Sequence, residues 1–328
     1  MRSKLSIILF LILVLNISTL SAQSECMNTI IEDLNPELFN KDFTGYDQNT
    51  AIYCAQLSEV AYWDTGEVSE LIADLNRRYP DFNHKYRFLE DKESGTQLIF
   101  FATRQYLIIA FRGTEFEKEF KDIVLDGKFF RYYQDSGYSD LPAGHGGFRR
   151  GIMNLMDRNK IFAELREFQS LCNINHESDF PVYTTGHSLG AALATLIIEP
   201  LHTEQFNFSG CYNFAPPLAI ELTETPELFA KYNSTVYDIV NYLDYVTRAG
   251  NSGRIHLGRI GKFYRICENG IINNEDEKRD GRYVSHRWRT KFRLYKFHKL
   301  SGYLDGVKNT KNSNEDIIKR KEDGTTCF

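Results

Sequence analysis

The stretch from Phe180 to Ala194 constrains the fold of this chain more than any other. It begins as a short β-branched and aromatic run, turns sharply at Gly186-His187-Ser188-Leu189-Gly190, and continues as an Ala- and Leu-rich helix. Strand and helix backbones approach closely around such a turn, so the positions that flank the serine must be small. A Gly-x-Ser-x-Gly turn between a strand and a helix is typical of a nucleophilic serine. The alternative is a glycine-rich turn with a structural role alone.

Length and composition favour a globular protein built around a large core. The chain has 328 residues, of which 42% are hydrophobic and 25% are charged, and its formal net charge is −5. These values are ordinary for a globular protein, and the length suits one large α/β domain. The net charge gives no reason to expect a nucleic-acid partner. Composition leaves the oligomeric state open.

The first 22 residues have the pattern of a secretory signal peptide. Arg2 and Lys4 precede an apolar run from Leu5 to Leu15, and small residues end the segment at Ala22. This order predicts cleavage after Ala22 and export to the periplasm or the medium. The apolar run is shorter than a transmembrane helix requires, although a retained N-terminal anchor is the alternative.

Six cysteines follow the predicted cleavage site, an even number that permits disulfides in an exported protein. Cys54 and Cys211 lie in apolar periodic segments and are predicted to be buried thiols. Cys26 and Cys327, near the chain ends, are the candidates for a bridge, with partners left open. The cysteine spacing does not fit a zinc site, and we expect neither a metal nor an organic cofactor.

Hydrophobic periodicity predicts strands that alternate with helices along most of the chain. Such an order indicates an α/β fold with a mostly parallel sheet and helices on both faces. We divide the chain into a signal peptide (1–22), one catalytic domain (23–307) and a polar tail (308–328). A surface loop is predicted over Glu268–Asp280. Helices are predicted over Asn49–Trp63, Val68–Arg78 and Phe148–Leu171, and strands over Gln97–Thr103, Tyr106–Phe111, Asn207–Phe214, Thr235–Tyr242 and Phe263–Cys267.

A serine alcohol needs a base, and the base needs a carboxylate that orients it. After a nucleophile elbow the chain order is serine, acid, histidine. Asp244 follows directly on the strand predicted to end at Tyr242, so it is the predicted acid. Asp238 lies within that strand and is the alternative, although exposure or pairing there suits it better.

Three histidines follow Asp244 in the sequence. His298 lies near the C-terminal end, just before a segment that could fix it, and is the predicted base. His286 and His256 are the alternatives. A polar residue at a helix start is the non-catalytic interpretation of His298.

The oxyanion formed during acyl transfer needs preorganised N–H donors. The backbone N–H of Leu189 is one candidate, because it lies at a helix N-terminus, where the dipole favours negative charge. Thr114 follows the strand Tyr106–Phe111 and offers both an N–H and a hydroxyl. Arg112 is expected to brace that loop rather than to contact substrate.

These segments together resemble the fungal-type (class 3) lipase family of α/β-hydrolases. The resemblance implies an α/β-hydrolase fold, the triad Ser188, Asp244 and His298, an oxyanion hole at Thr114 and Leu189, and triacylglycerol lipase-like activity without a cofactor. A phospholipase, a carboxylesterase of soluble esters and a non-catalytic lipid-binding module are the alternatives. The matching blocks are Ala110–Thr114, His145–Phe148, Thr185–Ala194, Tyr212–Pro217, Asn241–Val246 and His298–Tyr303.

Two positions depart from the family pattern. The family usually carries a proline next to or shortly after the valine that follows the acid, whereas Thr247 follows Val246 here. Ala215 stands where a glycine is common. Neither change removes a catalytic group, but both bear on loop shape and therefore on substrate fit.

Two further segments bear on the substrate. Glu115–Val124 corresponds to the family's mobile lid and is unusually charged; a lid would contact a lipid interface transiently, and a solvated helix that never moves is the alternative. Arg287–Leu294 alternates cationic and apolar residues, which predicts a strand with one cationic face. This face would attract anionic lipid headgroups or, alternatively, protect a sheet edge.

Overall fold

The computed structural model describes residues 33–42, 44–113, 141–172, 180–221, 225–241, 244, 246–248, 257–267, 270–273 and 298–308. The chain forms two compact units, Met1–Pro36 and Glu37–Phe328, and the site lies in the second. Several predicted features lie outside the described residues: the signal peptide, Thr114, the lid segment, His256, His286, the cationic strand and residues 309–328 of the tail.

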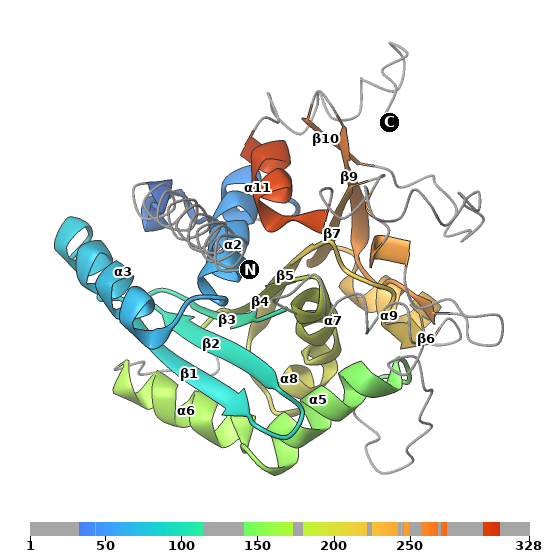
Figure 1. The fold of residues 1–328 in the computed structure, drawn as a ribbon, viewed down its shortest axis with the longest axis horizontal. Coiled ribbons are helices and arrows are strands. Elements are labelled where there is room, and N and C mark those ends of the chain that lie inside the picture. Colours follow the sequence, from blue (N-terminus) through green and yellow to red (C-terminus); the bar gives the residue numbers. More distant parts are fainter. Residues whose placement is uncertain are drawn as a thin grey trace, which may run out of the picture. The chain divides into compact units, whose positions relative to one another are not determined.

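An eight-stranded sheet forms the centre of the second unit (Figure 1). Its strand order is β1-β2-β3-β4-β5-β7-β9-β10. The five strands from β3 to β9 are parallel, and β1, β2 and β10 add to the two edges antiparallel. The sheet is therefore mostly parallel, as predicted. The bounds are β1 (Lys85–Asp91), β2 (Thr96–Ala102), β3 (Leu107–Phe111), β4 (Val182–His187), β5 (Phe208–Phe214), β7 (Val236–Asn241), β9 (Lys262–Cys267) and β10 (Gly270–Asn273), with a separate pair β6 (Ile220–Glu221) and β8 (Leu257–Gly258).

Helices cover both faces of the sheet, as two adjacent threonines of β4 make clear. The Thr184 hydroxyl donates to the Ala194 carbonyl of α7, whereas the Thr185 hydroxyl contacts Ser58 of α2. Successive side chains of a strand point to opposite faces, so α2 and α7 lie on opposite sides. The helices are α2 (Gln48–Val60), α3 (Thr65–Arg78), α5 (Gly146–Asp157), α6 (Ile161–Leu171), α7 (Leu189–Leu196), α8 (Ile198–Thr203), α9 (Thr225–Tyr232) and α11 (Leu300–Lys308), with short 3-10 turns at Pro36–Leu38 and Val246–Arg248.

The central strands are buried on both faces, and every residue of β3 and β4 is buried. Strands covered on both sides require near-continuous apolar sequence, which explains the run Leu107–Phe111. Cys54 and Cys211 are buried free thiols, as predicted. No helix of the described ranges is both long enough and apolar enough to cross a membrane.

Several elements differ from the sequence-based expectation, and three of them have a clear physical reason. The predicted helix over Phe148–Leu171 is interrupted between α5 and α6, where Lys160 adopts the left-handed conformation with φ of 47°. No glycine or proline marks this break. Strand β1 was not predicted, because its charged residues and its partial burial along most of its length give no alternating pattern. Strand β10 lies inside the segment that was predicted to be a loop, and that prediction was wrong there.

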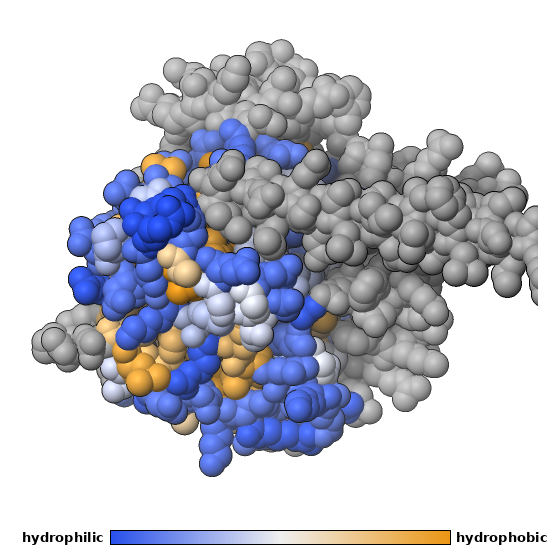
Figure 2. Space-filling view, turned by 60° about the vertical axis from the view of Figure 1, so that its left-hand side comes forward, coloured by the Kyte–Doolittle hydropathy of each residue, from blue (hydrophilic) through white to orange (hydrophobic). Residues whose placement is uncertain are grey.

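The surface over the β1 edge of the molecule is mostly hydrophilic. Figure 2 shows that the hydrophobic residues of this face form small separate groups among polar ones. Among the described residues, the exposed large hydrophobic side chains are Leu38 and Leu171. Isolated surface hydrophobics of this kind are ordinary in globular proteins, so the described part of this face gives no reason to propose a docking site.

Candidate active site

Ser188 lies at a strained turn between β4 and α7. Its backbone has φ of 57° and ψ of −124°, a conformation that side-chain-bearing residues rarely adopt. Its N–H donates to the Phe214 carbonyl at 2.9 Å, which fixes the turn against β5. A Cβ added at Gly186 would lie 2.4 Å from the carbonyl carbon of Gly190, and one at Gly190 would lie 2.2 Å from the Phe111 oxygen. The close backbone approach expected from the sequence is therefore present.

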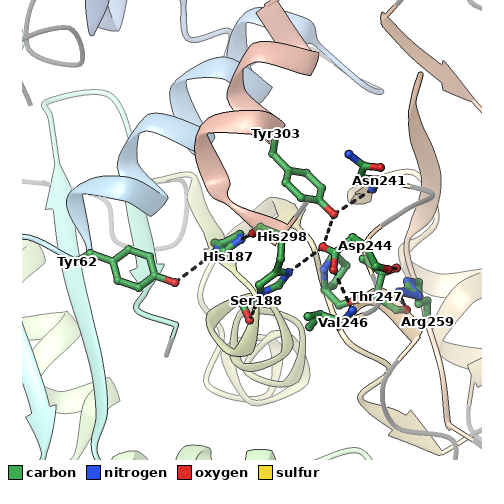
Figure 3. Close-up of polar contacts among 11 residues, drawn as sticks. Tyr62, His187, Ser188, Asn241, Asp244, Val246, Thr247, Arg259, His298 and Tyr303 are labelled. Carbon is green, nitrogen blue, oxygen red and sulfur yellow. Dashed lines mark hydrogen bonds and ion pairs between the residues drawn. The ribbon is translucent and has the colours of Figure 1, made fainter. Parts of the chain in front are cut away.

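His298 and Asp244 extend from this serine in one line of hydrogen bonds (Figure 3). His298 Nε2 lies 2.8 Å from Ser188 Oγ, and His298 Nδ1 lies 2.8 Å from Asp244 Oδ2. His298 lies two residues before the start of α11, and Asp244 lies three residues after the end of β7. All three side chains are buried. The structure thus brings together the three residues predicted to act together.

The hydrogen-bond partners define which ring nitrogen of His298 carries the proton. An ionised carboxylate only accepts hydrogen bonds, so Nδ1–H donates to Asp244. In a neutral imidazole Nε2 then accepts from the Ser188 hydroxyl. This tautomer is the one that a general base needs for a serine alcohol.

The Asp244 carboxylate is held by further donors. Its Oδ1 accepts the Val246 N–H at 2.9 Å, and its Oδ2 accepts the Tyr303 hydroxyl at 2.6 Å. The Tyr303 oxygen accepts in turn the Asn241 N–H at 3.0 Å, from the end of β7. Burial, followed by the charge of Asp244, raises the pKa of Tyr303 well above its ordinary value, so the phenol remains a donor. Tyr303 was not predicted, because nothing in its local sequence marks a contact with Asp244.

His187 and Tyr62 are also part of the site and were not predicted. His187 Nε2 lies 2.7 Å from the His298 carbonyl oxygen, and His187 Nδ1 lies 3.1 Å from the Tyr62 hydroxyl. Because a carbonyl only accepts, Nε2 carries the proton and Nδ1 accepts from Tyr62. Burial, with a smaller contribution from His298, holds the pKa of His187 well below its ordinary value. His187 is therefore neutral, and its Nε2–H donates to the main-chain carbonyl of His298 and holds that backbone in place.

The alternative acid, Asp238, does not reach His298. Its Oδ1 accepts the Asn213 side-chain amide at 2.9 Å, and its Oδ2 lies 3.9 Å from Arg259 Nε. Burial raises its pKa, although Arg259 and the hydrogen bonds oppose that shift. Asp238, within β7, is thus paired rather than exposed, which is one of the two alternatives predicted from the sequence.

The structure describes the predicted oxyanion loop up to Gly113, so Thr114 lies outside the described residues. Arg112 donates its backbone N–H to the Gln97 carbonyl at 3.0 Å and its guanidinium to the Gln97 side chain, so it braces this loop as predicted. A Cβ at Gly113 would lie 2.5 Å from the His187 carbonyl oxygen, so the loop passes directly against the elbow. Leu189 begins α7, where its N–H faces the helix N-terminus. Within the described residues, no cluster of three or more His, Cys, Asp or Glu side chains could hold a metal ion.

Comparison with known proteins agrees with this fold. A sequence profile described as Lipase (class 3) matches residues 108–252, a segment that includes Ser188 and Asp244 and ends before His298. No curated protein sequence matches the chain. Several solved structures superpose with TM-scores above 0.5 and cover most of both chains, three lipases among them.

The lipase of Rhizopus microsporus var. chinensis has a TM-score of 0.55 and 16% identity, over 83% of this chain and 93% of that one. The triacylglyceride lipase of Rhizomucor miehei has a TM-score of 0.55 and 16% identity, over 82% and 98%. A triacylglycerol lipase whose catalytic centre is described as a serine protease triad has a TM-score of 0.56 and 17% identity, over 80% and 95%.

The sheet order and the strand-turn-helix around Ser188 define an α/β-hydrolase fold, which these structures share. Within that fold, residues 108–252 match the class 3 lipase family, and the protein is a carboxylic ester hydrolase.

Proposed function

We propose that this protein hydrolyses carboxylic esters of lipids through an acyl-enzyme on Ser188, with His298 as the base and Asp244 as the orienting carboxylate. The observation that carries the proposal is the unbroken hydrogen-bond line from Ser188 Oγ through both nitrogens of His298 to Asp244. A buried, neutral imidazole in this tautomer can accept the serine proton while the carboxylate stabilises the imidazolium.

In the first half-reaction, Ser188 Oγ attacks the ester carbonyl carbon and its proton passes to His298 Nε2. The tetrahedral intermediate collapses when the bond to the alcohol oxygen breaks, and Nε2–H protonates that alcohol as it leaves. In the second half, a water attacks the acyl-enzyme carbonyl and gives its proton to Nε2. The intermediate then breaks its bond to Ser188 Oγ, which takes the proton back, and the carboxylic acid is released.

The negative charge on the carbonyl oxygen needs donors in both tetrahedral intermediates. We propose the backbone N–H of Leu189 as one of them, because it lies at the start of α7 directly after Ser188. Thr114 is proposed as the second, since it follows Gly113 and that glycine lies against the elbow. The dipole of α7 adds to the stabilisation at Leu189.

A fluorophosphonate probe tests the nucleophile directly. We expect the folded protein to be labelled on Ser188, as identified by peptide mass spectrometry, and Ser188→Ala to abolish both labelling and ester hydrolysis. Ser58→Ala is the matched control, because Ser58 is a buried serine whose hydroxyl donates to the Cys54 carbonyl of α2 at 2.9 Å. Folded protein in which Ser188 stays unlabelled would instead indicate a non-catalytic module.

The substrate class is proposed to be acylglycerols. The triacylglycerol lipases similar in fold carry this activity in their names. Hydrolysis rates on emulsified triacylglycerol, phospholipid vesicles and a short soluble ester separate the candidates. The acylglycerol proposal expects the emulsion to be the preferred substrate. A preference for vesicles would identify a phospholipase, and a preference for the soluble ester would identify a carboxylesterase.

We further propose that the protein is exported after cleavage at Ala22 and meets its substrate at a lipid interface. The n-region, apolar run and small residues of the first 22 positions support cleavage. The intact mass of protein recovered outside the cytoplasm tests this, because cleavage predicts an N-terminus at Gln23. An uncleaved N-terminus would contradict it. Co-sedimentation with anionic and neutral liposomes tests the interface, and equal, negligible binding to both would reject it.

A further inference from the structure

The acid loop, defined here as residues 244 and 246–248, is held by a largely buried arginine from a different connection. Arg259 lies between β8 and β9, and its side chain is 13% exposed. Its Nη2 donates to the Pro216 carbonyl at 2.7 Å and also to the Thr247 carbonyl. Figure 3 shows Arg259 beside Thr247, on the side of Asp244 away from His298. One guanidinium thus connects the acid loop with the turn after β5.

Thr247 transmits this restraint to Asp244. Its hydroxyl donates to the Asp244 carbonyl at 2.8 Å, while the Val246 N–H donates to Asp244 Oδ1 at 2.9 Å. These bonds form a tight turn in which the carboxylate orientation depends on residues 246 and 247. A shift of the Thr247 carbonyl therefore moves the group that orients His298.

The charge of Arg259 is balanced inside the protein. Asp238 Oδ2 lies 3.9 Å from Arg259 Nε, and the Asp238 carboxylate also accepts from Asn213 and from the Gly261 N–H. The Asn213 amide contacts the Thr195 hydroxyl of α7 at 2.9 Å. A buried polar path therefore runs from α7, the helix that begins after Ser188, through β5 and β7 to the acid loop.

A buried ion pair of this kind contributes little net stability, because desolvation of both charges offsets their attraction. The pair is better explained by geometry than by stability. Val246–Arg248 forms a 3-10 turn of only three residues. The hydrogen bond from Arg259 to the Thr247 carbonyl restrains the backbone of this turn.

We infer that Arg259 is a positioning residue, which holds the acid loop so that Asp244 keeps its contact with His298. The inference rests on the proposed function, since it assigns Arg259 a part in that reaction. It predicts that loss of the two carbonyl bonds lowers kcat and leaves KM for a soluble ester nearly unchanged. Substrate contacts remain, whereas the orientation of the base is impaired.

The test compares three proteins with the wild type, using p-nitrophenyl butyrate and counting active sites by fluorophosphonate titration. The double variant R259M/D238N removes both charges, so that no buried charge is left unpaired. We expect its kcat to fall about 10- to 100-fold with KM within about twofold, as for other small misplacements of catalytic groups. D238N alone keeps both carbonyl bonds of Arg259 and is expected to lose less than about threefold.

Arg87→Met controls for the general loss of an arginine. Arg87 pairs with Glu164 at 2.8 Å and with Glu167 at 3.2 Å, where it joins β1 to α6 far along the sheet from Asp244. The Arg87→Met substitution is expected to lower the Tm and to leave kcat unchanged. If the double variant does not fold, Arg259→Lys serves instead, with an intermediate kcat expected from its single ammonium.

Three results would overturn the inference. The first is a folded double variant, or R259K in its place, that has wild-type kcat. The second is an equal loss of kcat in D238N and in the double variant. The third is a change in KM without a change in kcat. A wild type that neither hydrolyses esters nor labels on Ser188 would reject the proposed function, and the inference would fall with it. Wild-type activity with an unaffected double variant would reject the role of Arg259 alone.

Discussion

The imidazole of His187 donates a hydrogen bond to the main-chain carbonyl of His298, with Nε2 and O 2.7 Å apart. The two rings lie with centroids 4.8 Å apart, and the second nitrogen of His187 contacts Tyr62. The residue before the nucleophile thus fixes the backbone of the residue that would deprotonate it. This contact links the elbow to the loop before α11 without involving Asp244.

Replacement of His187 is expected to slow the chemical step. His187→Phe removes the donor to the His298 carbonyl and should lower kcat about 10- to 100-fold, because the base loses its fixed position. His187→Gln retains an amide donor and should recover part of that loss. The measurement is kcat and KM on a soluble ester, with fluorophosphonate labelling as a second rate. Equal rates for the Phe and Gln variants would show that the hydrogen bond is unimportant.

Tyr303→Phe should weaken both stability and turnover. The change removes a donor to Asp244 and the hydroxyl oxygen that accepts the partly buried Asn241 N–H. Loss of the hydrogen bond to the Asp244 carboxylate costs about 1.5–3 kcal/mol, which denaturant unfolding would detect. We expect kcat to fall about tenfold, since a hydrogen bond to a charged group is worth about 1.5–3 kcal/mol.

Tyr237→Phe is the matched control for Tyr303. Its hydroxyl donates to the Ser234 carbonyl near the start of β7, at the opposite end of the strand from Asp244. Stability should fall and kcat should not. A similar fall in kcat for both variants would indicate a general structural effect instead.

Gly190→Ala should prevent normal folding of the elbow. The new Cβ would lie 2.2 Å from the Phe111 carbonyl oxygen, a backbone atom that cannot move without disrupting β3. Overpacking of this kind costs typically about 1–3 kcal/mol and occasionally more. Gly302→Ala is the control, because a Cβ there meets nothing within 4 Å and α11 should gain about 0.5–1 kcal/mol. Thermal unfolding of both variants checks the opposite signs.

His145 should make the folded state sensitive to mild acid. Burial lowers the pKa of His145 from 6.5 to about 4, so the folded state binds fewer protons than the unfolded state between these values. Stability due to the neutral ring is present above pH 6.5 and is lost as pH falls toward about 4, by at most about 1.4 kcal/mol per pH unit. The His145 side chain also caps α5, by accepting the Phe148 N–H.

His145→Asn isolates this titration, because asparagine is a good helix N-cap and does not titrate. Its unfolding free energy should depend less steeply on pH between 6.5 and 4 than that of the wild type. His84, whose pKa burial also lowers to about 4, contributes a similar slope in both proteins. An unchanged slope in the variant would contradict the assignment to His145.

The sequence predicted those parts of the site that local chemistry determines. Small residues around Ser188 reveal the turn, and Asp244 is recognisable because it follows an apolar strand. The contacts of His187 and Tyr303 could not be predicted, because each contact joins residues that are distant along the chain. The residues next to His187 and Tyr303 in the sequence do not indicate these contacts. The same holds for Arg259, whose partners come from three separate segments.

In the fold, too, features that local sequence determines were predicted, and features without a local sequence signal were missed. Continuous apolar runs predicted β2, β3, β5 and β7 to within a residue or two, because strands buried on both faces must be apolar. The interruption between α5 and α6 was missed, since apolar spacing continues through Lys160 and the left-handed residue there is not glycine. Edge strand β1 was missed because its partial exposure permits charged and polar residues in it. Strand β10 was missed because its four residues lie in an otherwise acidic and polar stretch.

The last described helix, α11, supplies Tyr303 and begins just after His298, and it packs on α2, where Gln48 Nε2 donates to the Val307 carbonyl at 2.9 Å. A nascent chain that has emerged only as far as β10 therefore holds its serine and carboxylate but lacks the imidazole between them. On the proposed mechanism, ester hydrolysis can therefore begin only once synthesis has passed residue 298 and α11 has docked on α2.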